Sequence, residues 1–392
     1  MKRTSWNQQD VKKKNKEIVL QKIIALAPLS RAEIAQRSGL NKATVSSLVS
    51  ELILEELIYE SGPGESSGGR RPVMLHFNEQ AGYSIGIDIG VNYTLGIVTD
   101  LVGNIFYEIN HPIPKPLSFD KQIQLVTETV NTLIEQTPKS KYGVIGIGIG
   151  VPGIVDNNGK VLLAPNLKWK DVDLVEILER EFNYPILVEN EANAGAYGEK
   201  RFGAGQKCNN IIYVSAGIGI GVGFILNGEL FRGNNGYAGE SGHMTIVTNG
   251  KKCECGCSGC WEAYASEHSL LKQAQEFDGL TEASLEQLIE LAEDNDKDTI
   301  KLFQGIGSYM GIGISNLIKT FNPQLVIIGN RLVKSKEWIK EPILETVKKE
   351  LSPFHQTDME IKFSKLSEYP TALGVSAFTI EEFLKIDQSE NV

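Results

Sequence analysis

The sequence predicts an α/β protein in which a small N-terminal domain, residues 1–80, precedes a two-lobed body, residues 81–392. Two observations carry this prediction. Residues 30–49 have the pattern of two short helices joined by a glycine turn, and segments 82–105 and 210–230 share one plan of apolar strand, glycine turn and apolar strand. Further strands and helices alternate after each of these segments, which favours a doubled α/β body with a cleft between its lobes.

The charge of the chain is divided unevenly between these two parts. Residues 1–80 hold 12 lysines and arginines against 9 acidic residues, whereas the remainder holds 27 against 40. A mildly basic head on an acidic body indicates that the head meets a polyanion. No apolar run reaches the roughly 20 residues of a membrane span. Because residues 1–17 also lack the apolar core of a secretory signal, we expect a cytoplasmic protein without membrane contact.

The segment SRAEIAQRSGLNKATVSSLV, residues 30–49, predicts a helix-turn-helix. Ile34 lies on the first helix, and Gly39 permits the left-handed turn that follows. Asn41 then caps a second helix whose apolar residues recur at intervals of three and four, namely Val45, Leu48, Val49 and Leu52. Polar side chains near the start of this helix suit base edges and phosphates in a DNA major groove: Asn41, Lys42, Thr44, Ser46 and Ser47.

The segments on either side of this motif predict a winged form of it. Residues 18–26 form an apolar helix that supplies the third member of the core, and residues 57–78 predict strand, glycine-rich tip and strand. Arg70 and Arg71 at the tip are expected to enter a minor groove or to pair with phosphates. The head is therefore predicted to bind DNA. The alternative is a three-helix protein-interaction module with a solvated basic loop.

In the body, polar residues gather where predicted strands end. They are Pro152 and Gly153, the triplet 189–191, Asn193, the run 240–243, and Glu262. Carboxylates accept hydrogen bonds from adjacent hydroxyls, while asparagine and neutral histidine both donate and accept. Grouped together, these residues indicate a sugar site, although each acidic residue taken singly is better explained as a solvated surface carboxylate.

Four of the five cysteines fall within CECGCSGC, residues 253–260. Such a cluster forms disulfides, carries out redox chemistry or holds a metal. Disulfides are the weakest of these alternatives, because cytosolic thiols stay reduced and neighbouring cysteines would close small, strained rings.

The body resembles the ROK family (repressors, open reading frames, sugar kinases) over residues 82–385. The resemblance rests on the motifs GIDIG, GVPGIVD, APNLKW, ENEANAGAYGE and GHMTIVTNGKKCECGCSGCWE, of which the last is the most specific. It implies an actin-like, RNase H-like two-lobed body that binds a sugar in its cleft. With the winged head in front, the whole chain resembles the repressor branch of the family, and within it xylose-responsive members, so xylose is the expected effector.

The resemblance also implies which residues act. A structural zinc ion is expected on His243, Cys253, Cys255 and Cys260, because three thiolates and one imidazole complete a closed tetrahedral shell. Cys257 is then a bystander, although a set of the four clustered cysteines without His243 remains an alternative, and Cys208 is expected in the core. The expected sugar contacts are Gly153, Asn190, Glu191, Glu240, His243 and Glu262.

Sequence departures separate this chain from the family's kinases. A kinase of the family carries its general base in an E-N-D triplet, but the third residue here is Glu191, and a misplacement of about an ångström can lower a rate about a hundredfold. The two turns that grip ATP phosphates in the family's kinases differ too, at Val91–Asn92 and at Ser215–Ala216, and the adenosine-side G-G-G motif is replaced by residues 328–330, which end in Asn330. We therefore expect a protein that is not an enzyme, with an active sugar kinase carrying a DNA-binding head as the alternative.

These features predict a sugar-responsive transcriptional repressor. A homodimer would place two heads on successive half-sites of a palindromic operator, about 34 Å apart or a multiple of that. Sugar binding would then release the operator, which requires the sugar to favour the conformation that does not bind DNA.

Overall fold

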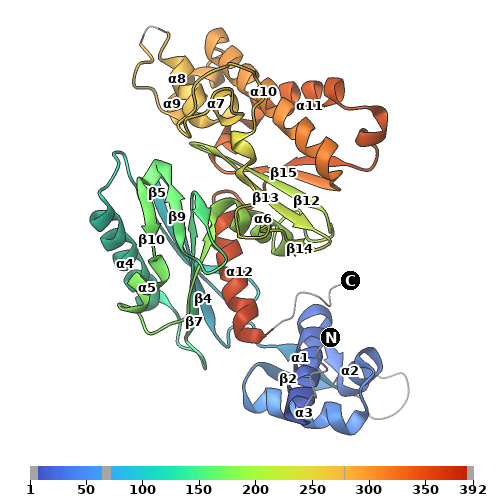
Figure 1. Cartoon of the computed structure of the whole chain (residues 1–392). Helices are drawn as coiled ribbons and strands as arrows, with labels where there is room; N and C mark the ends of the chain where they lie inside the picture. The colour runs from blue at the N-terminus through green and yellow to red at the C-terminus, as the bar shows by residue number, and fades with distance from the viewer. Residues whose placement is uncertain (1–7, 64–71, 278, 386–392) are drawn as a thin grey trace.

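The computed structural model describes residues 8–63, 72–277 and 279–385. Its N-terminal part, called the head below, is a three-helix unit with a small sheet (Figure 1). The elements are α1 (Gln8–Leu26), β1 (Leu29–Ser30), α2 (Arg31–Ser38), α3 (Lys42–Leu54), β2 (Ile58–Pro63) and β3 (Val73–Phe77). The strand order is β1-β3-β2, so β2 and β3 form the predicted wing. Its tip, with Arg70 and Arg71, lies outside the described residues.

Local sequence determines the helices of the head. Ser30 and Glu33 form a capping box that starts α2, and Gly39 ends it with a φ of 71°. Asn41 caps α3 through a 2.8 Å hydrogen bond from the Thr44 backbone nitrogen to its Oδ1. The predicted apolar side chains of α3 are all buried. The first helix starts ten residues earlier than predicted, because its polar first half is held against α3 by ion pairs such as Lys12–Glu51 at 2.7 Å.

The first lobe of the body is built on a five-stranded sheet with the order β11-β7-β4-β5-β6. The strands are β4 (Tyr83–Ile89), β5 (Tyr93–Thr99), β6 (Ile105–Pro112), β7 (Val144–Val151) and β11 (Ile186–Asn190). The helices are α4 (Phe119–Gln136) and α5 (Leu174–Glu179), while α6 (Glu191–Arg201) directly follows β11 but packs mainly on the sheet of the second lobe. A separate small sheet has the order β10-β9-β8 and is formed by β8 (Ile154–Val155), β9 (Val161–Ala164) and β10 (Trp169–Val172).

The second lobe repeats this plan with the strand order β14-β13-β12-β15-β16. Its strands are β12 (Ile211–Ala216), β13 (Ile220–Leu226), β14 (Glu229–Leu230), β15 (Leu325–Gly329) and β16 (Glu360–Phe363). Its helices are α7 (Glu262–Ala265), α8 (Glu267–Ala274), α9 (Leu285–Glu293), α10 (Lys297–Phe321) and α11 (Lys336–Glu350). Short 3-10 turns include η2 (Glu240–His243) and η3 (Arg331–Ser335). Both glycine hairpins therefore open sheets of one topology, as predicted.

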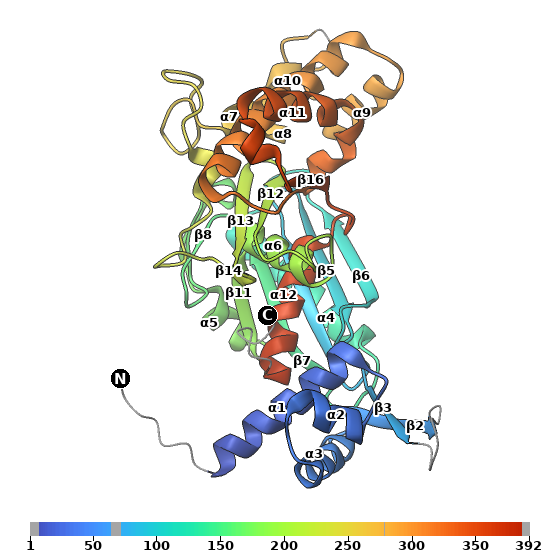
Figure 2. The same cartoon turned by 90° about the vertical axis from the view of Figure 1, so that its right-hand side faces the viewer.

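The last helix, α12 (Pro370–Leu384), runs beside α6 and down to the head, as both views show (Figures 1 and 2). Gly374 of α12 and Gly198 of α6 let these two helices approach closely. A Cβ on Gly374 would lie 1.8 Å from the carbonyl oxygen of Ala194, and a Cβ on Gly198 would lie 2.1 Å from that of Pro370. The far end of α12 enters the core of the head, where Ile380 and Leu384 join the same buried cluster as α1, α2 and α3. None of the described helices is both long and apolar enough to cross a membrane.

Candidate functional site

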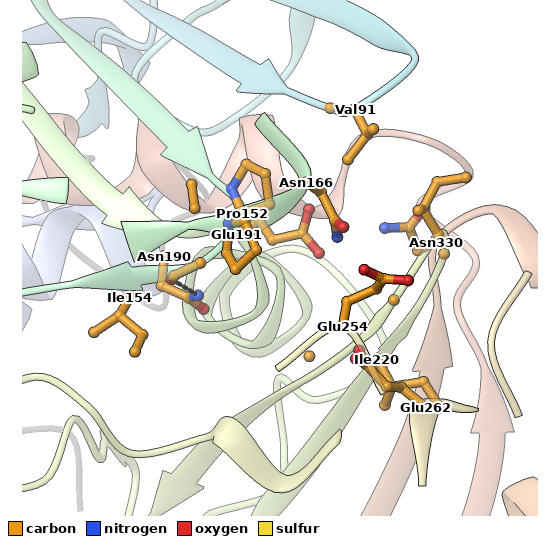
Figure 3. Close-up of a pocket in the computed structure, with 18 of the residues that line it drawn as sticks. Val91, Pro152, Ile154, Asn166, Asn190, Glu191, Ile220, Glu254, Glu262 and Asn330 are labelled. Carbon is orange, nitrogen blue, oxygen red and sulfur yellow. Dashed lines mark hydrogen bonds between the residues drawn. The ribbon is translucent and has the colours of Figure 1, made fainter. Parts of the chain in front are cut away.

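A cavity of about 420 Å³ lies between the strand ends of the two lobes (Figure 3). The strand-end turns of both sheets open onto it, which is where open α/β sheets usually bind ligands. Each of the predicted sugar contacts lines this cavity, called the pocket below: Gly153, Asn190, Glu191, Glu240, His243 and Glu262. The fold thus brings together residues separated by more than a hundred positions in the chain.

Asn190 forms one corner of the pocket and also starts α6. Its Oδ1 accepts hydrogen bonds from the backbone nitrogens of Ala192 and Asn193, at 2.9 and 3.0 Å. Its Nδ2 donates to the carbonyl oxygen of Gly153 at 2.7 Å. Gly153 has a φ of 107° and packs so closely on the next strand that a Cβ would lie 2.3 Å from Leu163 O. The pair therefore forms a rigid wall with one amide N–H left for a ligand.

Glu191 belongs to a buried acidic pair with Asp88. Burial raises the pKa of Glu191, while a hydrogen bond from Ser215, at 2.9 Å, opposes that rise. Burial and the nearby Glu191 raise the pKa of Asp88 well above its usual value, although Asp88 accepts a 2.7 Å hydrogen bond from the Tyr93 hydroxyl. Asp88 is buried and Glu191 is half-buried at the pocket wall, and two neighbouring carboxyl groups with little access to water resist simultaneous ionisation. The pair therefore retains protons at a higher pH than surface carboxylates do.

The strand-end pattern also groups Glu189 and Asn193 with the sugar contacts, and here the structure corrects it. Neither residue lines the pocket. Glu189 is buried and accepts hydrogen bonds from Arg232 Nε at 2.7 Å and from Asn193 Nδ2 at 3.1 Å. Successive residues of β11 point to opposite faces of the sheet, so Glu189 stabilises the support of the pocket.

The cysteine-rich loop forms a cluster that can hold a metal ion. The ligand atoms of His243, Cys253, Cys255 and Cys260 all lie within 4.8 Å of one another. Cys253 Sγ lies 3.6 Å from His243 Nδ1, and Cys255 Sγ lies 3.7 Å from Cys260 Sγ. All of these cysteines are free thiols. Three sulfur atoms and one imidazole nitrogen at this spacing fit a tetrahedral metal ion.

The other two cysteines lie outside this group. Cys257 is an exposed free thiol that does not belong to the cluster, and Cys208 is half-buried beside the core of α6 and β12. Gly256 and Gly259 adopt φ values of 90° and 82°, which give the loop its tight turn.

His243 belongs to both the cluster and the pocket. Its Nδ1 faces Cys253 and lies 3.4 Å from Glu262 Oε1, while its Nε2 lies 3.8 Å from Glu240 Oε2. Burial raises the pKa of Glu240, although His243 opposes that rise. A ligand on the Nδ1 side would fix the ring and leave Nε2 for a hydroxyl group in the pocket.

Several pocket residues were not predicted from the sequence. Asn166, Glu254 and Arg331 line the cavity, as do Cys255 and Asn330. Asn166 lies in the APNLKW motif, so the motif itself carried a signal for it. Glu254 lies in the cysteine-rich motif and Arg331 opens η3, but neither position was predicted to face the pocket. Figure 3 shows Glu191 and Asn330 entering the pocket from opposite sides.

In the head, the predicted DNA contacts lie on the first turns of α3. Lys42, Ser46 and Ser47 are exposed, and Thr44 is half-buried. Asn41 is exposed but uses its Oδ1 as the helix cap. The described part of this surface therefore presents one cation and several short polar groups.

The fold and site define a class of protein: a two-lobed sugar-binding body with a winged helix-turn-helix in front. The model of the ROK family matches residues 84–382, and the chain belongs to this family. A xylose repressor of Bacillus spizizenii is 46% identical over 376 residues, which cover 96% of this chain and 97% of the relative.

Two solved structures match different shares of the chain. A ROK family transcriptional regulator described as a homologue of the E. coli MLC protein has a TM-score of 0.79 at 26% identity, and the match covers 97% of this chain and all of that one. A ROK family glucokinase of Streptomyces griseus, solved with glucose and AMPPNP, has a TM-score of 0.70 at 28% identity. That match covers 98% of the kinase but 76% of this chain. Similarity to regulators thus includes the head.

Proposed function

We propose that the protein is a sugar-responsive transcriptional repressor whose effector is xylose. It acts in the cytoplasm as a homodimer on palindromic operator DNA and is released when the sugar binds. The observation that carries this proposal is the union of a DNA-binding head and a preformed sugar pocket in one chain. The 46% identity with a xylose repressor over nearly the full length supports xylose as the effector.

The proposed division of labour follows the domains. Residues 1–80 bind operator DNA through the start of α3, with Asn41, Lys42, Thr44, Ser46 and Ser47 in the major groove and Arg70 and Arg71 on the wing. Residues 81–392 bind sugar and form the dimer. The exposed polar start of α3 supports the first part of this proposal.

Sugar hydroxyls are proposed to bind Gly153, Asn190, Glu191, Glu240, His243 and Glu262. A cavity of about 420 Å³ is of the size that takes small ligands. The absence of kinase activity is supported by Glu191, because its side chain is one methylene longer than the aspartate that the family's kinases carry at this position. A general base must reach the proton that it removes, and a carboxylate displaced by about an ångström does so less readily.

Zinc is the proposed occupant of the cluster of His243, Cys253, Cys255 and Cys260. A Cys₃His donor set without an open position suits a structural zinc ion. When bound, zinc would supply a fixed orientation for the cysteine-rich loop. His243 would then present Nε2 to the sugar.

A path of contacts supports transmission from the pocket to the head. The hydroxyl of Thr371, at the start of α12, donates a 3.3 Å hydrogen bond to the Glu191 carbonyl oxygen. At the other end of α12, Phe383 packs edge-to-face on Tyr142, with ring centroids 4.9 Å apart. The Tyr142 hydroxyl donates a 3.0 Å hydrogen bond to the carbonyl oxygen of Glu55, which is the C-cap residue of α3. A shift of α12 would therefore reorient α3.

A mobility-shift titration tests the function. Wild-type protein should bind a palindromic duplex more tightly than a scrambled one, and xylose should release it. Lys42→Ala should weaken operator binding and reduce its salt dependence by about one counterion, while Lys301→Ala, on α10 of the second lobe, should behave like the wild type. No retardation of either duplex at low salt would remove the repressor proposal. Sugar-dependent ADP release at ~1 s⁻¹ or faster would instead favour the kinase.

A further inference from the structure

Three polar side chains form a continuous hydrogen-bonded chain beside the pocket. Asn330 Nδ2 donates to Ser215 Oγ at 3.0 Å, and Ser215 Oγ donates to Glu191 Oε1 at 2.9 Å. Every donor in this chain points toward the carboxylate, an arrangement in which each bond strengthens the next. Glu191 Oε2 accepts no hydrogen bond from the described residues and is left for a ligand.

The backbone of Asn330 is strained. Its φ of 67° and ψ of −168° fall in a region that is essentially restricted to glycine. The residue holds this conformation while Oδ1 accepts a 2.6 Å hydrogen bond from the Arg331 backbone nitrogen and Nδ2 binds Ser215. Its amide also packs against the turn after β12, because a Cβ on Gly217 would lie 3.1 Å from it. A glycine would adopt this backbone without strain. The hydrogen bonds of the side chain must therefore explain why position 330 is an asparagine.

The chain of hydrogen bonds joins the two lobes. Glu191 opens α6 directly after β11 of the first sheet, whereas Ser215 lies on β12 of the second sheet. Asn330 directly follows β15, whose Gly329 is the register partner of Ser215. Asn330 and the neighbouring Arg331 also line a second cavity of about 690 Å³, which Asp88, Tyr93 and Tyr213 line as well. A ligand that moves Glu191 therefore pulls on the ends of two central strands of the opposite lobe.

We propose that Ser215 and Asn330 are positioning residues for sugar recognition: they hold Glu191 so that Oε2 faces a sugar hydroxyl, and they tie sugar binding to the second lobe. This inference rests on the proposed function, because it takes the ligand of the pocket to be a sugar. Asn330 acts through Ser215, and Ser215 acts through Glu191. The three residues hence form one unit.

Titration calorimetry with xylose tests the unit. Asn330→Gly should weaken xylose binding about tenfold, which corresponds to ~1.4 kcal/mol, while its melting temperature stays level or rises because the strain is relieved. Ser215→Ala should weaken binding to a similar degree. The double variant should bind no more weakly than Ser215→Ala alone, since residues acting in series are not additive.

A matched control is Asn322→Gly at the end of α10. Asn322 is exposed and has a φ of 45°, so this variant also replaces an asparagine of positive φ by glycine, but at a position that does not contact the pocket. This variant should bind xylose like the wild type. Wild-type affinity in Asn330→Gly, or additive losses in the double variant, would overturn the proposal and leave Asn330 a packing residue. A wild-type protein that binds no xylose would instead count against the proposed function.

Discussion

Replacing Tyr142 with phenylalanine tests how the body holds α3, the helix proposed to read DNA. Tyr142 lies between α4 and β7, and its hydroxyl donates to the Glu55 carbonyl oxygen at 3.0 Å. The ring packs on Phe383 of α12 with an interplanar angle of 70°. Tyr142→Phe removes the hydroxyl alone, so the aromatic contact with α12 stays while the bond to the end of α3 is lost.

The size of the effect follows from that one bond. A neutral hydrogen bond contributes a net ~0.5–1.5 kcal/mol, and 1 kcal/mol corresponds to about a fivefold change in an equilibrium constant. The neighbouring ion pair of Lys141 with Glu56, at 3.2 Å, is exposed and contributes little. We therefore expect the ratio of operator dissociation constants with and without xylose to fall about fivefold.

Fluorescence anisotropy with a labelled palindromic duplex, measured with and without xylose, gives this ratio. Calorimetry on the DNA-free protein should return a xylose affinity within about twofold of the wild type, because the substitution is remote from the pocket. Tyr107→Phe on β6 is the control, since its hydroxyl makes no hydrogen bond within the described residues. An unchanged ratio in a folded Tyr142→Phe protein would refute transmission through Tyr142.

Two further predictions concern the metal cluster and the acidic pair beside the pocket. Cys255→Ser should lose bound metal, measured by elemental analysis, and weaken xylose binding by about tenfold or more; metal loss with unchanged affinity would disprove the coupling through His243. Asp88→Asn should keep the Tyr93 hydrogen bond and remove the buried charge. Because the pKa of Asp88 and that of Glu191 are raised in the folded protein, their stabilisation is present in acid and lost as the pH rises from about 4 through those raised values. Thermal melts of Asp88→Asn should therefore vary less with pH than those of the wild type above about pH 4, with a higher midpoint than the wild type in alkaline buffer; a lower midpoint there would contradict this.

Local rules were enough to predict the helices of the head. Gly39, Asn41 and the apolar spacing of α3 act within a few residues of each other, so the sequence alone indicates their structure. Gly153, Asn190 and Glu191 lie at strand ends, which share one edge of a sheet, whereas Glu240, His243 and Glu262 were expected from the family resemblance. The family resemblance then added His243 to the cysteine cluster.

Features that depend on distant pairing were not predictable. Asn330 reaches Ser215 across 115 positions through the pairing of β15 with β12. The first half of α1 is polar, so apolar periodicity could not indicate its start; ion pairs with α3, such as Lys16–Glu55, hold it instead. The contact of α12 with the head was likewise not predictable, because it depends on the packing of Ile380 and Leu384 against helices that lie far away in the sequence.

The core of the head has a consequence for exchanging specificity between relatives. Its buried cluster is completed by side chains from the body, namely Leu101, Ile145, Ile380 and Leu384. A chimera cut at the boundary between head and body would separate these side chains from the helices that they cover and expose apolar surface on both pieces. A head taken from a relative should therefore transfer its operator preference only when the segments around Leu101 and Ile145 and the end of α12 come from the same relative. The unit that can be exchanged is therefore defined by which side chains pack together, and it includes parts of the body that lie far from the head in the sequence.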